Sequence, residues 1–472
     1  MTISIKSIGG GFNEAPVITE LKTVGTIEKD RITVSYKVTD ADLQIIRHYI
    51  TISGICENKE ITKNVGYEAE NGIFNYTITG LTRGTTYTIQ IRCSDGVDSV
   101  NSKAIQVRTK DICIYTVTID EANSNPTSSV TYGGDAAGIA PAKIKNSGGW
   151  GDRFPFNKIR IVGFKGGQVT KAINPNDKTK YIGGENVPSD IDVMVEIPKI
   201  YWKVTTSGNK YTIHISDDKI DSSYDCDRHK VKGVERDCIY VGAYLGVVQN
   251  SKLRSISNVS VSLYPTSNML TMCSTATNSG AGYQLFNNDT LILLRILFLL
   301  KFKTRDSQSV LGNGRDGNTL RTGYSNAAGL DSSTCFLGIE DIWTIYDQGV
   351  AGVKGGYRLG GQNSFPLFVC EDNYSFKDGN YPKNDSTEWT WGHVGRVKTN
   401  RKTLFFPLRS DGASVTTHYT DQFYITDESY YCYGGVRYPS SSTDKKIAEA
   451  GIFSSRLEES GNNFCRLVYL GT

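Results

Sequence analysis

The most apolar stretch of the chain runs from Leu291 to Phe302 and reads LILLRILFLLKF, with Arg295 inside it. A membrane-spanning helix needs about 20 apolar residues, so we expect a buried helix here rather than a membrane span. Polar residues at Asn287-Asn288-Asp289 supply N-cap chemistry, and the pattern predicts a helix within Leu285–Phe302. Because this helix is apolar nearly all round, it should be enclosed by a core.

A predicted β-hairpin precedes this helix. Asp192–Val204 reads DVMVEIPKIYWKV, and TTSGN then leads into KYTIHI over Lys210–Ile215, with Gly208-Asn209 supplying the turn. Pro198 has no N–H for a ladder and marks an edge or a bulge. His214 alternates with apolar neighbours, so we interpret it as a residue of the solvated face rather than a ligand. Helix, hairpin and Gly-rich loops together predict an α+β domain over residues 111–472.

Residues 13–110 show a different pattern, an alternation of apolar and polar residues with period two. The runs are Ile32–Val38, Tyr49–Ser53, Phe74–Ile78 and Tyr87–Ile91, and turn residues separate them. Short strands at this spacing are typical of a β-sandwich.

The stretch Leu81–Tyr87, LTRGTTY, resembles the tyrosine corner of fibronectin type III and related immunoglobulin-like domains. The resemblance implies that the Tyr87 hydroxyl bonds back to the backbone. The core Trp usual in such domains is missing, and Tyr36 is expected to fill its space. It also implies an immunoglobulin/fibronectin III-like sandwich over residues 13–110 that acts as a spacer.

Size and charge limit the function classes. The chain has 472 residues, which suggests about three domains at roughly 150 residues each. Lys+Arg 52 against Asp+Glu 49 leaves a net charge of +3, so we expect no nucleic-acid partner and no membrane insertion. The first residues show no apolar h-region, and we interpret residues 1–12 as an attachment segment without a signal peptide. Ten scattered cysteines without CxxC pairs indicate mostly reduced thiols of a protein made in a cytosol, although their even number leaves disulfides possible.

Motifs for catalysis and cofactors are scarce. The sequence lacks a P-loop, HExxH, GxSxG or EF-hand loop, and the GxGxxG match at Gly312–Gly317 follows a helix instead of a strand. We therefore predict no cofactor and no catalytic residue. One stretch, Asp225–Cys238, reads DCDRHKVKGVERDC and leaves three alternatives open. Cys226, His229 and Cys238, with Asp225, Asp227 and Asp237, could bind Zn²⁺, the cysteines could form a disulfide, or the stretch is a polar loop, which we prefer.

Several motifs in residues 111–472 resemble tail proteins of phages that infect Gram-positive hosts. They are GGWGDRFPFN from Gly148, VEIPKIYW from Val195, and the apolar helix with its TRDSQS exit. GIEDIW from Gly338, AGIF from Ala450 and NNFCRLV from Asn462 resemble C-type-lectin-like folds of the formylglycine-generating-enzyme type. The resemblance implies a C-type-lectin-like receptor-binding domain. The calcium motifs of C-type lectins are absent, and the copper-binding cysteine pair of the enzymes does not map onto Cys432 and Cys465.

Aromatic residues interleaved with polar ones form the candidate ligand-binding face. Tyr and Trp offer large rigid contact areas with a polar tip, and apolar sugar faces stack on them. In phage proteins of this fold, this part of the chain carries the variable ligand-binding face. The candidate contacts are Trp389, Trp391, His393, Tyr419, Tyr424, Tyr430, Tyr431, Tyr433, Arg437 and Tyr438. The alternative is that half of these rings pack in the core. We assign three other aromatic residues, Phe405, Phe406 and Phe453, to the core in either case.

These features together predict a virion protein of a phage or phage-tail-like particle that binds a host cell-surface receptor. The partners would be a cell-wall glycan or a surface protein, together with other tail or baseplate proteins. Tail proteins in general suggest a homotrimer. The alternatives are a structural baseplate component, an enzyme of the formylglycine-generating type, and a cell-wall hydrolase.

Overall fold

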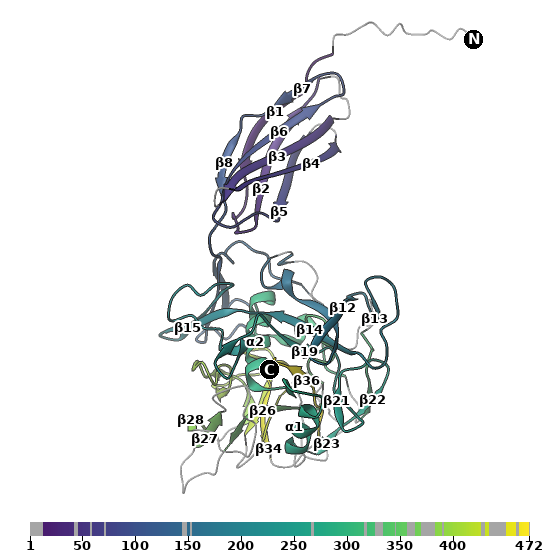
Figure 1. The fold of residues 1–472 in the computed structure, drawn as a ribbon. Helices are drawn as coiled ribbons and strands as arrows, with labels where there is room; N and C mark the ends of the chain where they lie inside the picture. Colours follow the sequence, from purple (N-terminus) through teal and green to yellow (C-terminus); the bar gives the residue numbers. More distant parts are fainter. Residues whose placement is uncertain are drawn as a thin grey trace, which may run out of the picture. The chain divides into compact units, whose positions relative to one another are not determined.

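Contacts along the chain divide it into two units, Met1–Ile114 and Tyr115–Thr472, whereas the sequence placed the boundary after residue 110. The computed structural model describes residues 13–41, 46–56, 59–69, 72–143, 149–151, 153–265, 269–315, 319–325, 334–344, 346–355, 364–369, 383–388, 391–425, 430–433, 450–458 and 462–471. The proposed attachment segment, residues 1–12, lies outside these ranges. Each unit has its own sheets and its own core (Figure 1).

Unit 1 is a sandwich of two antiparallel sheets that share one core. The first sheet has the order β1–β2–β5, and the second has the order β4–β3–β6–β7, with β8 also pairing with β6. The strands are β1 (Val17–Thr23), β2 (Arg31–Thr39), β3 (Ile46–Cys56), β4 (Lys59–Ala69), β5 (Gly72–Thr79), β6 (Thr86–Ser94), β7 (Ser99–Asn101) and β8 (Ile105–Arg108). On β2, Ile32, Val34, Tyr36 and Val38 are all buried, at the predicted period. The β-sandwich expected from this alternation is confirmed.

The corner expected around Tyr87 is present. The hydroxyl of Tyr87 accepts a hydrogen bond from the backbone N–H of Thr82 at 2.8 Å. The ring of Tyr87 is wholly buried, and so is that of Tyr36, which belongs to the same core cluster. A buried ring with a satisfied hydroxyl fixes the entry to β6.

Unit 2 contains three larger sheets. A four-stranded sheet has the order β10–β9–β16–β15, and two seven-stranded sheets have the orders β13–β12–β11–β14–β19–β36–β24 and β28–β27–β26–β33–β34–β32–β29. The strands of the first two sheets are β9 (Ile114–Asp120), β10 (Val130–Gly134), β11 (Arg160–Lys165), β12 (Gln168–Asn174), β13 (Asp177–Tyr181), β14 (Asp192–Pro198), β15 (Tyr201–Ser207), β16 (Lys210–Ser216), β19 (Cys238–Gly242), β24 (Tyr283–Leu285) and β36 (Leu467–Tyr469). Those of the third are β26 (Gln348–Gly355), β27 (Ser364–Val369), β28 (Lys383–Glu388), β29 (Trp391–His393), β32 (Gln422–Ile425), β33 (Tyr430–Tyr433) and β34 (Ser455–Glu458).

Short ribbons and helices complete unit 2. The two-stranded pairs are β17 (Lys230–Val231) with β18 (Val234–Glu235), β20 (Val247–Gln249) with β21 (Lys252–Arg254), β22 (Ser260–Ser262) with β25 (Thr319–Arg321), β23 (Tyr264–Pro265) with β35 (Asn462–Asn463), and β30 (Arg396–Val397) with β31 (Pro407–Arg409). The helices are α1 (Met269–Thr277), α2 (Asn288–Phe302) and α3 (Ser307–Leu311), with the 3₁₀ turns η2 (Phe156–Lys158) and η3 (Asp227–His229).

The predicted helix is confirmed as α2. Asn287 caps it, because its side-chain oxygen accepts a hydrogen bond from the N–H of Thr290 at 2.9 Å. Lys303 ends it in the left-handed region, with φ 55°. Every side chain of α2 is buried except Lys301, as the all-round apolar pattern predicted. Among the described residues, no helix is long and apolar enough to cross a membrane.

The hairpin prediction is right in its second half and wrong in its first. β15 and β16 pair from Ser207↔Lys210 onward, around a turn in which Gly208 has φ 60°. Asp192–Pro198, however, is a separate strand in another sheet, where it pairs with β11 and β19. The ladder stops at Pro198, which has no N–H to donate, and the chain crosses to the four-stranded sheet. Strands dominate both units, so the chain is a multidomain protein that is mainly β.

Candidate functional site

The structure describes only part of the predicted aromatic face. Trp389, Arg437 and Tyr438 lie outside the described residues. For Trp391, Tyr430, Tyr431 and Tyr433 it gives the course of the backbone, in β29 and β33. His393, Tyr419 and Tyr424 are described with their side chains, and His393 is half-buried in β29.

Tyr419 is a core residue, which corrects its assignment as a ligand contact. Its side chain is wholly buried, and its hydroxyl shares a hydrogen bond with that of Tyr211. The guanidinium carbon of Arg305 lies 5.0 Å from the centre of its ring, and the ring of Phe453 lies at 5.1 Å. Burial raises the pKa of Tyr419. A residue enclosed in this way has no surface left for a ligand. Phe405, Phe406 and Phe453 are buried, as predicted.

Tyr424 has the opposite environment. In β32 the side chain of Phe423 is 2% exposed and that of Tyr424 is 41% exposed, so the pleat turns Tyr424 away from the core. The strand register pairs Tyr424 with Trp391 on one side and with Arg456 on the other. Arg456 in turn pairs with Cys432 of β33. Trp391 and Tyr424 therefore lie in one row across the edge of this sheet.

Two tyrosines of β33 are paired with different kinds of residue in the neighbouring strands. Tyr431 is in register with Leu457, whose side chain is wholly buried. Tyr430 is in register with Glu458 and with the half-buried Lys354. The backbone register therefore places Tyr431 opposite a residue of the core, and Tyr430 opposite Glu458 and Lys354.

Buried polar groups at the foot of β32 fix this edge of the sheet. Asp421, which precedes the strand, accepts hydrogen bonds from the hydroxyl of Ser307 at 3.0 and 3.1 Å and from the N–H of Phe453 at 2.8 Å. Gln308 donates to the carbonyl of Ala450 at 2.8 Å. The SQS segment that follows α2 and the AGIF segment are distant in sequence, and both contact the start of β32. Burial raises the pKa of Asp421 to about 8.

A second buried network joins two further motifs. Arg466 is wholly buried, and it donates to the carbonyls of Glu340 and Asp341 at 2.9 and 2.8 Å and to that of Gly242 at 2.9 Å. Gln348 donates to the carbonyl of Asp341 at 2.8 Å. The GIEDIW and NNFCRLV segments are thus held together by one guanidinium.

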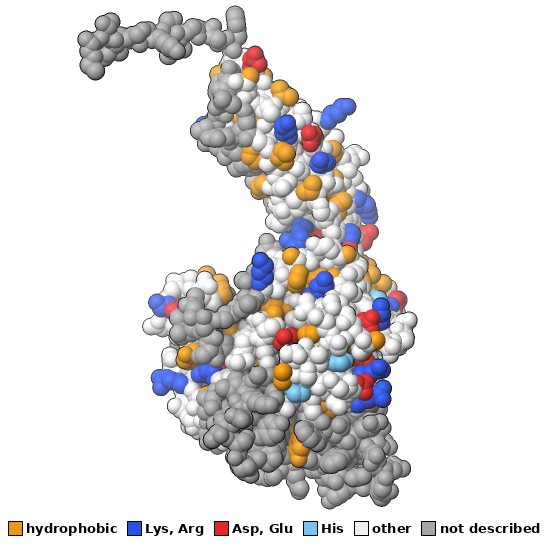
Figure 2. All heavy atoms as spheres, turned by 180° about the vertical axis from the view of Figure 1, so that it is seen from behind, with side chains coloured by type: hydrophobic (Ala, Val, Ile, Leu, Met, Phe, Trp, Pro, Cys, Tyr) orange, Lys and Arg blue, Asp and Glu red, His pale blue; other side chains and the backbone are white. Residues whose placement is uncertain are grey.

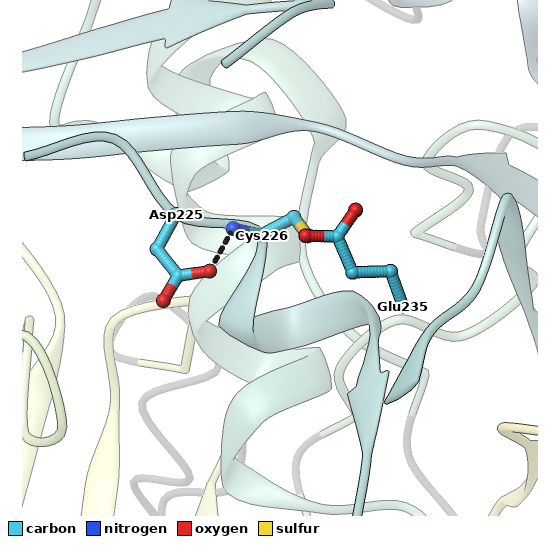
Figure 3. A group of neighbouring side chains, drawn as sticks. All are labelled: Asp225, Cys226 and Glu235. Carbon is cyan, nitrogen blue, oxygen red and sulfur yellow. Dashed lines mark hydrogen bonds between the residues drawn. The ribbon is translucent and has the colours of Figure 1, made fainter. Parts of the chain in front are cut away.

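The candidate metal set from the sequence is not brought together. Among the described residues, one group of three potential ligands is close enough to hold an ion, and it consists of Asp225, Cys226 and Glu235 (Figure 3). The thiol of Cys226 points toward the carboxylate of Glu235, and its backbone N–H donates to Asp225 at 2.7 Å. His229 and Cys238 are outside this group. Cys226 and Cys238 are both free thiols, so the disulfide alternative is not realised.

Two lysines already neutralise this group. Lys230 forms an ion pair with Asp225 and lies 3.9 Å from a carboxylate oxygen of Glu235. Lys199 lies 3.4 Å from the other oxygen of Glu235, which also accepts a 2.6 Å hydrogen bond from Tyr201. Burial raises the pKa of Cys226 to about 12, so the thiol keeps its proton. An ammonium group therefore stands where a cation would bind, which favours the polar-loop interpretation.

The neighbouring Asp227 belongs to a different cluster, which the sequence did not indicate. It accepts hydrogen bonds from Arg401 at 2.7 and 3.0 Å and from the indole N–H of Trp202 at 3.0 Å. The guanidinium of Arg401 stacks 4.1 Å from the centre of the Trp202 ring. Burial opposes ionisation of Asp227, but the charges of Arg228 and Arg401 outweigh it and lower its pKa to about 2. Burial lowers the pKa of His229 to about 4.

Comparison with known proteins adds no relative. No model of a protein family matches the chain, and no curated protein matches it. On the face drawn in Figure 2, basic and acidic side chains are interspersed over the described residues. Tyr424 is the strongest candidate for recognition among the described residues of the predicted face, because its side chain is exposed and its strand is anchored by the buried hydrogen bonds of Asp421.

Proposed function

We propose that this chain is a tail protein of a phage or phage-tail-like particle and that unit 2 binds a receptor on the host cell surface. The observation that carries the proposal is the row in which Trp391 and Tyr424 are paired, at the edge of a seven-stranded sheet. Tyr424 is 41% exposed there, although the strand that bears it is anchored by buried hydrogen bonds. Exposed aromatic residues on a rigid support suit recognition, because little conformational entropy is lost on binding.

Unit 1 would be a fibronectin III-like spacer. Its support is the division into sheets of β1–β2–β5 and β4–β3–β6–β7/β8, together with the hydrogen bond from Thr82 to the hydroxyl of Tyr87. A sandwich of this kind separates a binding domain from its attachment point without taking part in recognition itself.

Unit 2 would be a C-type-lectin-like domain. Its support is that the three motifs that resemble this fold are held by buried hydrogen bonds. Arg466 of NNFCRLV donates to the carbonyl of Glu340 in GIEDIW, and Asp421 binds both Phe453 of AGIF and Ser307 of the TRDSQS segment. Loops and strand edges around a fixed core are the usual location of binding sites. The receptor would be a cell-wall glycan or a surface protein, bound by stacking and hydrogen bonds without covalent chemistry. A homotrimer on the particle would multiply weak single-site affinity.

The test is binding of the labelled full-length protein to panels of Gram-positive cells, with and without periodate oxidation of their glycans. We expect strain-selective binding that Tyr424→Ala weakens about tenfold or more, the loss expected of an aromatic anchor. The matched control is Tyr324→Ala, because Tyr324 is 38% exposed and lies outside the proposed row. Loss of binding after periodate identifies a glycan, and survival identifies a protein or another resistant receptor. Absence of binding by a folded sample favours a structural baseplate role.

A further inference from the structure

The GxGxxG match at Gly312–Gly317 contains an Asn-Gly pair, Asn313-Gly314, that belongs to no regular element. α3 ends at Leu311, and Asn313 is exposed to solvent. Gly314 is buried, but its N–H makes no hydrogen bond within the described part of the chain. The backbone nitrogen of Gly314 and the side-chain amide of Asn313 are therefore not held by other partners there.

The chain is fixed on both sides of this pair. Before it, the N–H of Gly312 donates to the carbonyl of Gln308 at 2.8 Å and closes the end of α3. After it, the guanidinium of Arg315 donates to the carboxylate of Asp341 at 2.9 and 3.1 Å, and Asp341 is wholly buried. The Asn-Gly pair is thus a short span between a helix end and a buried ion pair.

We propose that Asn313 is a site of spontaneous deamidation. The backbone nitrogen of Gly314 attacks Cγ of Asn313, and the proton of that N–H ends on the side-chain nitrogen, which leaves as ammonia. Water then breaks one of the two C–N bonds of the cyclic imide: cleavage at Cγ gives aspartate, and cleavage at the main-chain carbonyl gives isoaspartate. One water is consumed and one ammonia is released, without an oxidant or a cofactor. Glycine at the second position favours the attack, because it has no Cβ to obstruct the approach and its backbone rotates most freely.

The modification changes both the charge and the length of the chain at this point. Lys+Arg 52 against Asp+Glu 49 gives +3, and one new carboxylate makes the difference 52 against 50, or +2. The new charge lies two residues from Arg315, where it competes with Asp341 for the guanidinium. Isoaspartate also inserts the side-chain methylene of residue 313 into the main chain. Because both ends of the span are fixed, we expect the contact between Arg315 and Asp341 to weaken in the modified protein.

The test is incubation of the folded full-length protein at pH 8.5 and 37 °C, followed by peptide mass spectrometry that separates aspartate from isoaspartate. We expect both products at residue 313 to form at least about tenfold faster than at Asn400, which is also exposed but precedes Arg401. Mapping also separates Asn313 from the other Asn-Gly pair of the sequence, Asn71-Gly72.

Two variants isolate the chemistry. Asn313→Gln should stop the reaction at this position, because the longer side chain would have to close a larger and slower-forming ring. Gly314→Ala should slow it about tenfold, since a Cβ then hinders the approach. Gly314 is not among the glycines with positive φ, so alanine is compatible with its backbone conformation.

Either of two results in the wild-type protein would overturn the proposal, and neither requires a variant to fold. One is equal rates of deamidation at Asn313 and Asn400. The other is an Asn313 that stays intact in the folded chain but deamidates in urea, which would show that the fold protects it. The inference does not depend on receptor binding, so the cell-binding experiment leaves it unchanged in either outcome.

Discussion

Arg295 and Asp421 bind the backbone of the same turn, residues 451–455: Arg295 binds its carbonyl groups and Asp421 binds an N–H group. Arg295 donates to the carbonyls of Ile452 and Ser454, at 2.7 and 2.9 Å, and Asp421 accepts from the N–H of Phe453 between them. Both side chains are wholly buried, and they come from segments far apart in the sequence. The turn 451–455 is therefore fixed through its backbone, independently of the side chains that it displays.

Replacement of Arg295 by Met should destabilise unit 2 by about 3 kcal/mol, because several buried carbonyls would lose their donor. Urea unfolding monitored by fluorescence measures the change. Arg108→Met is the control, since the side chain of Arg108 is 59% exposed, and it should alter stability by less than about 0.5 kcal/mol. A loss of stability in Arg295→Met no larger than that of the control would contradict the role of this guanidinium.

Tyr419 and Tyr424, two of the six tyrosines of the predicted face, should differ in a stability assay. Tyr419→Ala removes a wholly buried ring and should cost about 3–5 kcal/mol. Tyr424→Ala, at a side chain that is 41% exposed, should cost less than about 1 kcal/mol. Thermal unfolding of both variants measures the difference. If the two variants had equal stability, the assignment of Tyr419 to the core would be wrong.

Tyr87→Phe should destabilise unit 1 by about 1 kcal/mol, because the N–H of Thr82 would lose its acceptor while the ring stays in the core. Tyr49→Phe provides a comparison, since the ring of Tyr49 retains its contact with Arg92, 4.7 Å from the ring centre. Calorimetric unfolding of the full-length variants distinguishes them. An unchanged transition in Tyr87→Phe would show that the corner does not depend on this hydrogen bond.

The cluster around Asp227 predicts a dependence of stability on acid. The native pKa of Asp227 is about 2 and its ordinary value is 3.8, so its contribution is complete above pH 4 and is lost as pH falls toward 2. The loss should be about 2 kcal/mol. Asp227→Asn should remove this part of the acid dependence, measured by urea unfolding at pH 5 and pH 2.5. Asp237→Asn should leave it intact, and equal acid dependence in wild type and Asp227→Asn would refute the assignment.

The buried thiols should react slowly in the native protein. Burial raises the pKa values of Cys226 and Cys465 to about 12, and only the thiolate is a good nucleophile. At pH 8 we expect iodoacetamide to label both cysteines in denaturant and neither in the folded chain, as mapped by peptide mass spectrometry. Rapid labelling of Cys465 in the folded protein would show that its surroundings open more readily than its burial indicates.

The sequence predicted those elements whose structure is determined by residues close together in the chain. The alternation in β2, the cap at Asn287 and the turn at Gly208 each depend on a few neighbouring residues, and each was predictable. The burial of Tyr419 was not predictable in this way, because its hydrogen-bond partner Tyr211 is 208 residues away in the sequence. Arg401 likewise reaches Asp227 over 174 residues. Arg295 is a charge inside an apolar helix, and its position could have indicated a buried polar network because a buried guanidinium needs hydrogen-bond acceptors.

The position of β36 has a consequence for biosynthesis. This strand lies between β19 and β24, and it pairs Tyr469 with Tyr240 and with Tyr283. The sheet that contains β14 therefore stays incomplete until β36 has left the ribosome, whereas unit 1 forms all its ladders from residues before Ile114. We expect unit 1 to be folded while unit 2 is still a nascent chain with unpaired strand edges, so that unit 2 is the part that depends on chaperones during synthesis.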